Sequence, residues 1–206
     1  MAFCETSDTG VIGKTIVVVQ DWPSCNKIAT KEKVPSELSL KDPNNWGSLI
    51  GPKEQRHMWT KLLLDVPKSG EVDKIMKELS LSDKQGSSAK PVEIIAKYLA
   101  HVKAHMIKNL DIHYGKGLWM TLPLTLVITV PAVWSDAAKD STLQSVNKAG
   151  FNNIELPQLK RTILTTEPEA AAIYTIQELR GGIQDDQFAV GDGFVVCDMG
   201  GGTVDL

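Results

Sequence analysis

The part of the sequence best suited to chemistry is a glycine-rich string near its C-terminal end, Asp198-Met-Gly-Gly-Gly-Thr-Val-Asp205. Three consecutive glycines weaken a strand, so a compensating role is expected for them. Glycine N–H groups have no Cβ in the way and can approach phosphate oxygens closely, which applies to Gly200, Gly201 and Gly202. Thr203 adds a hydroxyl donor, and Asp198 stands where a carboxylate could hold a magnesium-bound water. The string predicts a phosphate-binding loop; the alternative is a tight turn flanked by surface acids.

A second phosphate-type pattern lies near the N-terminal end. Gly10-Val-Ile-Gly13-Lys14-Thr15 ends like the P-loop pattern Gly-x-x-x-x-Gly-Lys-Thr. However, Asp8 occupies the position of the first glycine, and a β-branched run follows where the motif needs a helix N-terminus. We therefore do not expect a working P-loop.

The elements that must position such a loop alternate between strands and helices. Apolar residues at helical spacing follow Pro91 as far as Leu110, and Pro at the first turn favours helix initiation. The run at residues 124–130 is continuously apolar and β-rich, typical of a strand covered on both faces. Ser135 or Asp136 can cap a helix that ends before Gly150. These signals indicate an α/β fold.

Weaker signals complete the pattern. We expect a strand within residues 154–164, a helix over 169–179 opened by Pro168, and a last buried strand at 194–197. Towards the N-terminus, the composition predicts a buried strand at 16–19, an edge strand at 34–40, a short strand at 46–50 and helical turns within 54–65 and 72–79.

Composition narrows the function classes. The 206 residues suggest one domain or two small lobes, and 22 basic against 25 acidic residues give a net charge of −3. That balance argues against nucleic-acid binding through bulk charge. The three cysteines form no Cys-x-x-Cys pair, which predicts neither a disulfide framework nor a four-thiolate zinc site and fits a reducing compartment. No signal peptide or membrane-length apolar run is found, so a cytoplasmic location is expected.

The histidines and tryptophans are expected to have structural rather than functional roles. His101 and His105 are one helical turn apart, but without a third ligand a polar helix face is favoured over a metal site. The five tryptophans are spread along the chain and indicate packing rather than a base-stacking platform.

Three strings together resemble the 70-kilodalton heat-shock chaperones of the actin-like ATPase superfamily. Residues 195–206 resemble the second phosphate motif of that family. Val127-Ile-Thr-Val-Pro-Ala-Val-Trp-Ser-Asp136 resembles its strand–proline–helix segment, and Thr166-Glu-Pro-Glu-Ala-Ala-Ala172 resembles its Glu-Pro-Thr-Ala-Ala-Ala segment. The match covers residues 127–206 firmly. The first 120 residues are similar, more loosely, to a divergent fungal branch, through Asp21-Trp22-Pro23, Val34-Pro35-Ser36-Glu37, Trp46-Gly47 and Lys61-Leu-Leu-Leu-Asp65.

The resemblance implies a fold and a set of roles. It implies an actin-like ATPase (ribonuclease H-like) lobe I, with a mixed sheet flanked by helices, over residues 1–190, and the first strand and phosphate loop of lobe II over 191–206. It implies ATP or ADP with Mg²⁺ as cofactors, and client proteins or co-chaperones as partners of a longer parent. The implied site residues are Asp198 for magnesium-bound water, Gly200, Gly201, Gly202 and Thr203 for the phosphates, Asp205 and Glu167 for catalysis, and Pro131 and Lys139 for a nucleotide-dependent switch. Plain alternatives for the last two are a strand terminator and a solvated helix face.

The chain also departs from the family pattern. It lacks the opening Asp-x-Gly-Thr-Thr loop, and Gly51 stands where the family places a lysine four residues after a glycine, leaving Lys53 or Lys61 as substitutes. We therefore expect a chain clipped at both ends. Two functions remain open: a chaperone-like ATPase active in the parent protein, or a non-catalytic fragment or lobe-only interaction module.

Overall fold

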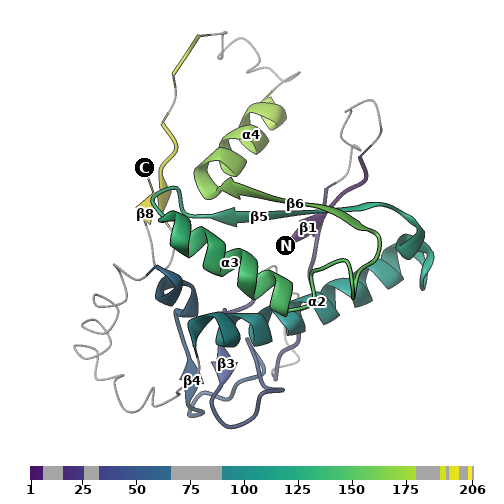
Figure 1. Cartoon of the computed structure of the whole chain (residues 1–206), viewed down its shortest axis with the longest axis vertical. Coiled ribbons are helices and arrows are strands. Elements are labelled where there is room, and N and C mark those ends of the chain that lie inside the picture. The colour runs from purple at the N-terminus through teal and green to yellow at the C-terminus, as the bar shows by residue number, and fades with distance from the viewer. Residues whose placement is uncertain are drawn as a thin grey trace.

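The computed structural model describes residues 1–6, 16–25, 33–65, 90–179, 191–193, 195–199 and 204–205. In these residues the chain is mixed α/β, with three α-helices, two short 3₁₀ helices and four separate two-stranded β-pairs (Figure 1). The expected α/β class is confirmed. A single mixed sheet is not found in the described part of the chain, where each strand pairs with one partner only.

The largest β-pair joins β5 (Leu124–Val130) to β6 (Leu159–Thr166) in parallel. Helix α3 (Asp136–Lys148) forms the crossover between them, as parallel neighbours require. The register pairs Val130 with Thr166, so both strands end at the same edge. Figure 1 shows this edge next to the start of α3 and of α4 (Glu167–Leu179).

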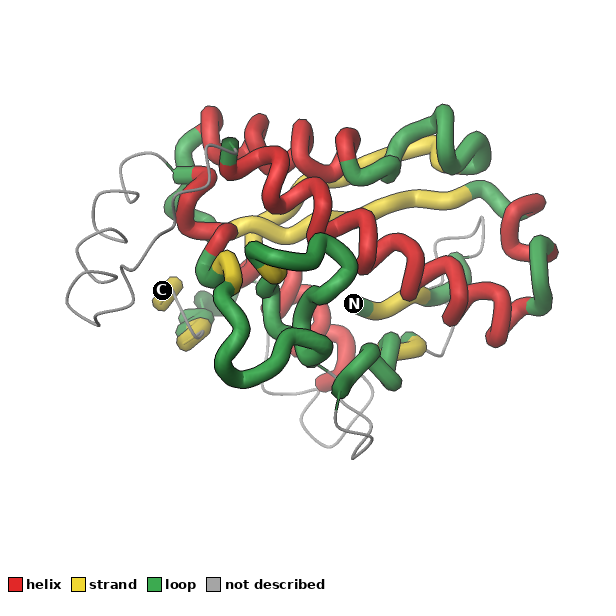
Figure 2. Tube along the Cα trace, turned by 90° about the horizontal axis from the view of Figure 1, so that it is seen from below, coloured by secondary structure: helices red, strands yellow, loops and turns green. Residues whose placement is uncertain are grey.

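One face of β5–β6 carries the main core. Helix α2 (Pro91–Tyr114) and α3 lie along the two strands (Figure 2). Leu124, Leu126 and Ile128 of β5 pack against the buried cluster that these helices share. The cluster consists of Met106, Leu110, Trp119, Val146, Ala149, Phe151 and Leu156. The predicted start of α2 at Pro91 is confirmed, and burial of its apolar stripe stabilises the helix.

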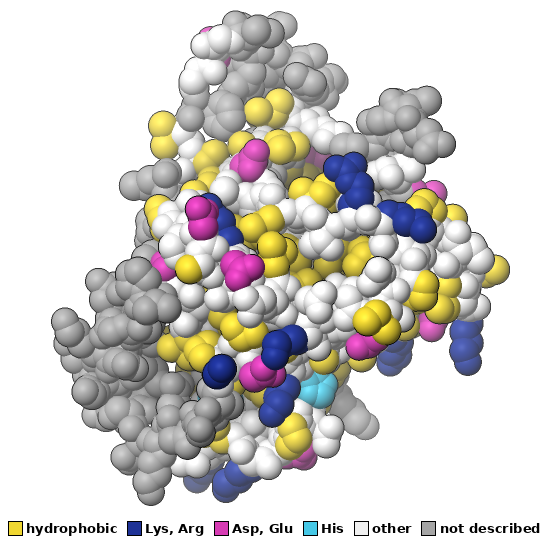
Figure 3. Space-filling model, in the orientation of Figure 1, with side chains coloured by type: hydrophobic (Ala, Val, Ile, Leu, Met, Phe, Trp, Pro, Cys, Tyr) yellow, Lys and Arg dark blue, Asp and Glu magenta, His cyan; other side chains and the backbone are white. Residues whose placement is uncertain are grey.

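The other face of β5 is open, which corrects the expectation of a strand covered on both sides. Thr125, Val127 and Thr129 are exposed, and Val127 keeps 56% of its surface accessible. Helix α4 contacts both strands but has no buried residue, and its Ile173 is 59% exposed. Figure 3 shows hydrophobic side chains at the surface between α4 and α3. A continuous apolar run occurs both in strands covered on two faces and in strands with one open face, so the sequence pattern could not distinguish these two arrangements.

The N-terminal strands are shorter than predicted. β1 (Ala2–Phe3) pairs with β2 (Val17–Val18), and β3 (Leu38–Ser39) pairs with β4 (Arg56–His57), both antiparallel. The stretch 46–50 forms turns and isolated bridges instead of a strand, and the helical signal within 54–65 is a 3₁₀ helix, η1 (Thr60–Leu64). Trp46 makes an isolated bridge with Leu38 and lies in a buried cluster with Val19, Trp22, Leu38, Ile94 and Val102.

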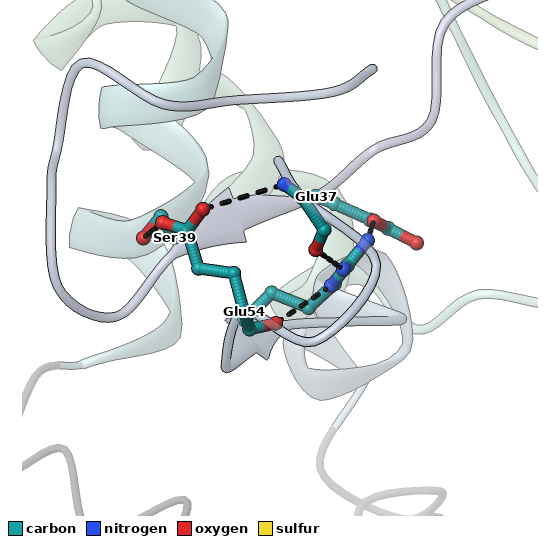
Figure 4. A network of polar contacts seen from close by, with 5 residues as sticks. Glu37, Ser39 and Glu54 are labelled. Atoms are coloured by element: carbon teal, nitrogen blue, oxygen red, sulfur yellow. Dashed lines mark hydrogen bonds and ion pairs between the residues drawn. The ribbon is translucent and has the colours of Figure 1, made fainter. Parts of the chain in front are cut away.

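A polar network holds β3 against the turn before β4 (Figure 4). The Ser39 hydroxyl donates to the Glu54 carboxylate, and this hydrogen bond is the main cause that lowers the pKa of Glu54. The Arg56 guanidinium pairs with Glu37 at 2.8 Å and also donates to the Gly51 carbonyl. The network therefore fixes the loop that leads towards η1.

His101 and His105 of α2 do not form the polar surface expected from the sequence. His105 is 9% exposed, lies against Trp22, and has its Nε2 3.1 Å from the Gln20 carbonyl oxygen. His101 stacks on Trp46 and has its Nε2 2.7 Å from the Pro43 carbonyl oxygen. Both rings attach α2 to the N-terminal segment. No group of three or more metal-ligating side chains is found among the described residues.

Further boundaries differ from the predictions. β6 begins at Leu159 because residues 152–155 form a turn with Asn152 as side-chain acceptor. Residues 195–197 are not a buried strand: they precede β7 (Asp198–Met199), and Val195 is 84% exposed. The helical signal at 72–79 and the Gly10–Thr15 pattern lie outside the described residues. The three cysteines are exposed and free. No described helix has the length and apolar character to cross a membrane.

Candidate functional site

The candidate site lies at the edge where β5 and β6 end. Glu167 is the first residue of α4, directly after the last residue of β6. A reciprocal capping arrangement fixes this junction: the Glu169 N–H donates to the Thr166 hydroxyl at 3.2 Å, and the Thr166 N–H donates to the Glu169 carboxylate at 3.4 Å. The Thr165 hydroxyl also donates to that carboxylate and is the main cause that lowers the pKa of Glu169. The cap explains why α4 starts before Pro168 and why Glu167 faces the site from a defined position.

The end of β5 is equally well fixed. Pro131 is fully buried, and its carbonyl accepts a hydrogen bond of 3.3 Å from the Trp134 N–H, which turns the chain towards α3. Ser135, one of the two N-cap candidates that the sequence offered, is the N-cap of α3, and its hydroxyl accepts from the Ala138 N–H at 3.3 Å. The same hydroxyl donates to the buried Asp65 carboxylate at 3.2 Å. This bond ties the end of η1 to the start of α3.

Lys61 of η1 contacts the two other segments of the site, Glu167 at the start of α4 and Trp134 just before α3. It lies in η1, between the buried residues Thr60 and Leu64. Its ammonium forms an ion pair with the Glu167 carboxylate and lies over the Trp134 ring, 5.7 Å from the ring centroid. The Lys61 and Glu167 side chains are 44% and 21% exposed, so solvent still reaches the pair. An accessible ammonium of this kind can serve as a point charge for a phosphate group.

The remaining predicted site residues lie apart from this pair or outside the description. Lys139 pairs with Asp136 of the same helix at 3.2 Å, on the surface of the first turn of α3. Asp198 and Asp205 are backbone partners in the antiparallel pair of β7 and β8 (Val204–Asp205). Gly200, Gly201, Gly202 and Thr203 lie outside the described residues. Figure 1 places β8 on the side of the molecule where β5 ends.

Known proteins match the chain over most of its length. No family model matches it. Heat shock 70 kDa protein 12A of Homo sapiens is 25% identical, over 93% of this chain and 36% of the relative. The chaperone protein HscA homolog of Verminephrobacter eiseniae is 31% identical, over 95% of this chain and 24% of the relative. A second HscA homolog, from Neisseria meningitidis serogroup B, is 33% identical over 62% of this chain.

The chain is similar to 70-kilodalton heat-shock proteins. The matches support an Hsp70-like relative. The chain spans about a third of the length of heat shock 70 kDa protein 12A and about a quarter of the HscA homolog.

The sequence left either Lys53 or Lys61 as the substitute for the lysine of the Hsp70 pattern, and the structure distinguishes these two residues. Lys61 reaches Glu167, whereas Lys53 lies exposed in the turn before β4 and has no ion pair within the described residues. Trp134 was predicted only to pack, and its contact with the ammonium was missed. The sequence shows that Trp134 follows the end of β5, because it lies three residues after Pro131. The sequence gives no sign that η1, which carries Lys61, lies next to Trp134.

Proposed function

We propose that this chain is part of an ATP-binding, chaperone-like ATPase of the heat-shock and actin superfamily. The observation that carries the proposal is the ion pair of Lys61 and Glu167 at the edge where the parallel strands β5 and β6 end. In open α/β sheets, ligands bind in the crevice outside the carboxyl ends of the strands. A lysine held there by a carboxylate 106 positions away in the sequence suits recognition of a triphosphate.

Each residue then has a role. Gly200, Gly201, Gly202 and Thr203 would donate hydrogen bonds to the β- and γ-phosphates. Asp198 would hold Mg²⁺ through a bound water, with Asp205 assisting, and the ion when bound supplies charge neutralisation. Lys61 would balance charge on the terminal phosphate, and Glu167 would fix the Lys61 ammonium and orient the attacking water. Pro131 and Lys139 are proposed to couple nucleotide state to α3.

The pairing of β7 with β8 fits this assignment. Asp198 and Asp205 occupy directly paired positions of the two strands. The four residues between the strand ends, 200–203, form the connection that we propose to contact phosphate.

The finer assignments are proposals on the same basis. We propose residues 1–190 as lobe I of an actin-like ATPase and 191–206 as the first part of lobe II, in a protein of the divergent fungal-type branch. We also propose a cytoplasmic location, ADP as the product retained, and client proteins or co-chaperones as partners.

A second candidate function is a non-catalytic lobe that binds partners. The open face of β5, with Val127 56% exposed, favours it, because a nucleotide lobe normally buries its sheet on both sides. Magnesium-dependent phosphate release from ATP separates the two. Release that is lost in Asp198→Ala and in Glu167→Gln, and kept in the surface control Glu93→Gln, supports the ATPase. Nucleotide binding without release supports the non-catalytic lobe, and neither activity in a folded sample rejects the proposed ATPase.

A further inference from the structure

The environment of Lys61 contains a group with no part in the roles above, the indole of Trp134. The Lys61 ammonium lies over this ring, within the distance at which the ring quadrupole attracts a cation. Tryptophan is the strongest of the aromatic side chains in this contact. The ammonium therefore has two anchors on different elements, the Glu167 carboxylate at the start of α4 and the Trp134 ring before α3.

The ring is a fixed platform. Trp134 is 4% exposed and packs in a buried cluster with Leu64, Ile95, Val130 and Ala138. These partners come from η1, α2, β5 and α3, so the ring cannot shift without disturbing four elements. Lys61, by contrast, is 44% exposed and has a long flexible stem. The position of the Lys61 ammonium must therefore be fixed by the groups that it contacts, the Glu167 carboxylate and the Trp134 ring.

An indole at position 134 is unfavourable in one respect, because it buries a hydrogen-bond donor. The buried Nε1–H of Trp134 has no hydrogen-bond partner within the part of the chain that the structure describes. Buried donors are nearly always paired, and an apolar side chain such as phenylalanine would have no donor to leave unpaired. The indole offers the larger π face towards Lys61, and the attraction of the ammonium to that face offsets the cost of the unpaired N–H.

We propose that Trp134 is a positioning residue for Lys61: its ring face holds the ammonium at the carboxyl edge of β5–β6, with N–H donors left for a terminal phosphate. An ammonium has three donors, and Glu167 is the only acceptor that the described residues provide for Lys61. The use of those donors for phosphate rests on the proposed function. The positioning itself is independent of nucleotide and can be measured without it.

The first test is the NMR signal of the Lys61 ε-methylene protons in the full chain without nucleotide, assigned by its loss in Lys61→Met. Protons above a ring face shift upfield, so we expect Lys61 to be displaced from the other lysines. The displacement should vanish in Trp134→Leu and largely persist in Trp134→Phe. An undisplaced signal in the unmodified protein overturns the inference, and this holds even where Trp134→Leu fails to fold.

The second test is the affinity for magnesium-ATP. A cation–π contact of this kind corresponds to roughly a three- to thirtyfold change in an equilibrium constant. We expect Trp134→Leu to weaken binding by that factor and Trp134→Phe to stay within about threefold of the unmodified protein. Equal affinities for all three, or equal losses in both variants, overturn the inference.

A matched control is Trp119→Phe. Trp119 is 5% exposed, against 4% for Trp134, and its indole N–H donates to the Asp111 carboxylate. It belongs to η2 (Leu118–Thr121), which precedes β5, roughly 20 Å from the edge where that strand ends. It should leave both the Lys61 signal and the affinity unchanged. Absence of magnesium-ATP binding in the folded, unmodified protein rejects the proposed function, while the NMR signal still decides whether Trp134 positions Lys61.

Discussion

Replacing Glu167 by glutamine should impair the site while leaving the fold nearly as stable as before. The ion pair with Lys61 is partly exposed, with side-chain accessibilities of 44% and 21%. Measured pairs of this kind contribute about 0.2–1 kcal/mol to stability. For a domain of this size, 1 kcal/mol corresponds to a shift in the unfolding midpoint of about 2–4 °C. Glu167→Gln should therefore lower the midpoint by less than about 4 °C.

The shift of the unfolding midpoint in Glu167→Gln can be compared with that of a core substitution in η1, the element that carries Lys61. Leu64 is 5% exposed and packs against Trp134 and Val130. Truncating a buried leucine typically costs about 2–5 kcal/mol, so Leu64→Ala should lower the midpoint by roughly 4–20 °C.

Thermal unfolding followed by circular dichroism measures both variants, and a double-mutant cycle of Glu167→Gln with Lys61→Met isolates the pair. We expect a coupling energy below about 1 kcal/mol that shrinks as salt is added. A midpoint loss in Glu167→Gln as large as that of Leu64→Ala would refute the reasoning, because the pair would then hold the fold together rather than serve a site.

Three further predictions concern the supporting structure. Burial, with Lys97 nearby, lowers the pKa of His57 from its usual value, so the unfolded chain binds more protons below pH about 6.5. The free energy of unfolding should then fall as the pH drops through about 6.5, and His57→Gln should flatten that slope in urea titrations; an unchanged slope contradicts this. Thr166→Ala should cost about 0.5–2 kcal/mol by removing the cap of α4, whereas Thr166→Ser should retain most of it; equal losses in the two variants would be evidence against the cap. Gly150 has φ +87°, a backbone conformation that L side chains rarely adopt, so Gly150→Ala should cost about 1–3 kcal/mol in thermal unfolding, a prediction that an unshifted midpoint would defeat.

The sequence predicted the regular elements best where periodicity and caps agreed. The helix from Pro91, the strand Leu124–Val130, the Ser135 cap and the terminating Gly150 are all confirmed. Each of these is specified locally, by a 3.6-residue repeat, a β-branched run, a side-chain acceptor or a positive φ.

Features set by tertiary packing were not predictable. The exposure of Val127, the packing of His105 and the shortness of β3 depend on which elements face one another. The pairing of Lys61 with Glu167 belongs to the same class: the sequence offered Lys53 and Lys61 equally, and only the placement of η1 beside the end of β6 distinguishes them. The contact of Lys61 with Trp134 carried no sequence signal at all.

The most direct test of the proposed site is calorimetric titration of magnesium-ATP into the purified chain and two variants, Lys61→Met and Lys53→Met. The two lysines lie eight positions apart, but Lys61 pairs with Glu167 and Lys53 is exposed in a turn. We predict measurable binding that Lys61→Met weakens by at least about tenfold, equivalent to about 1.4 kcal/mol, and that Lys53→Met leaves unchanged. The same affinity in all three proteins, or no binding to a folded sample of the unmodified chain, would contradict the assignment of a nucleotide site to the edge where β5 and β6 end.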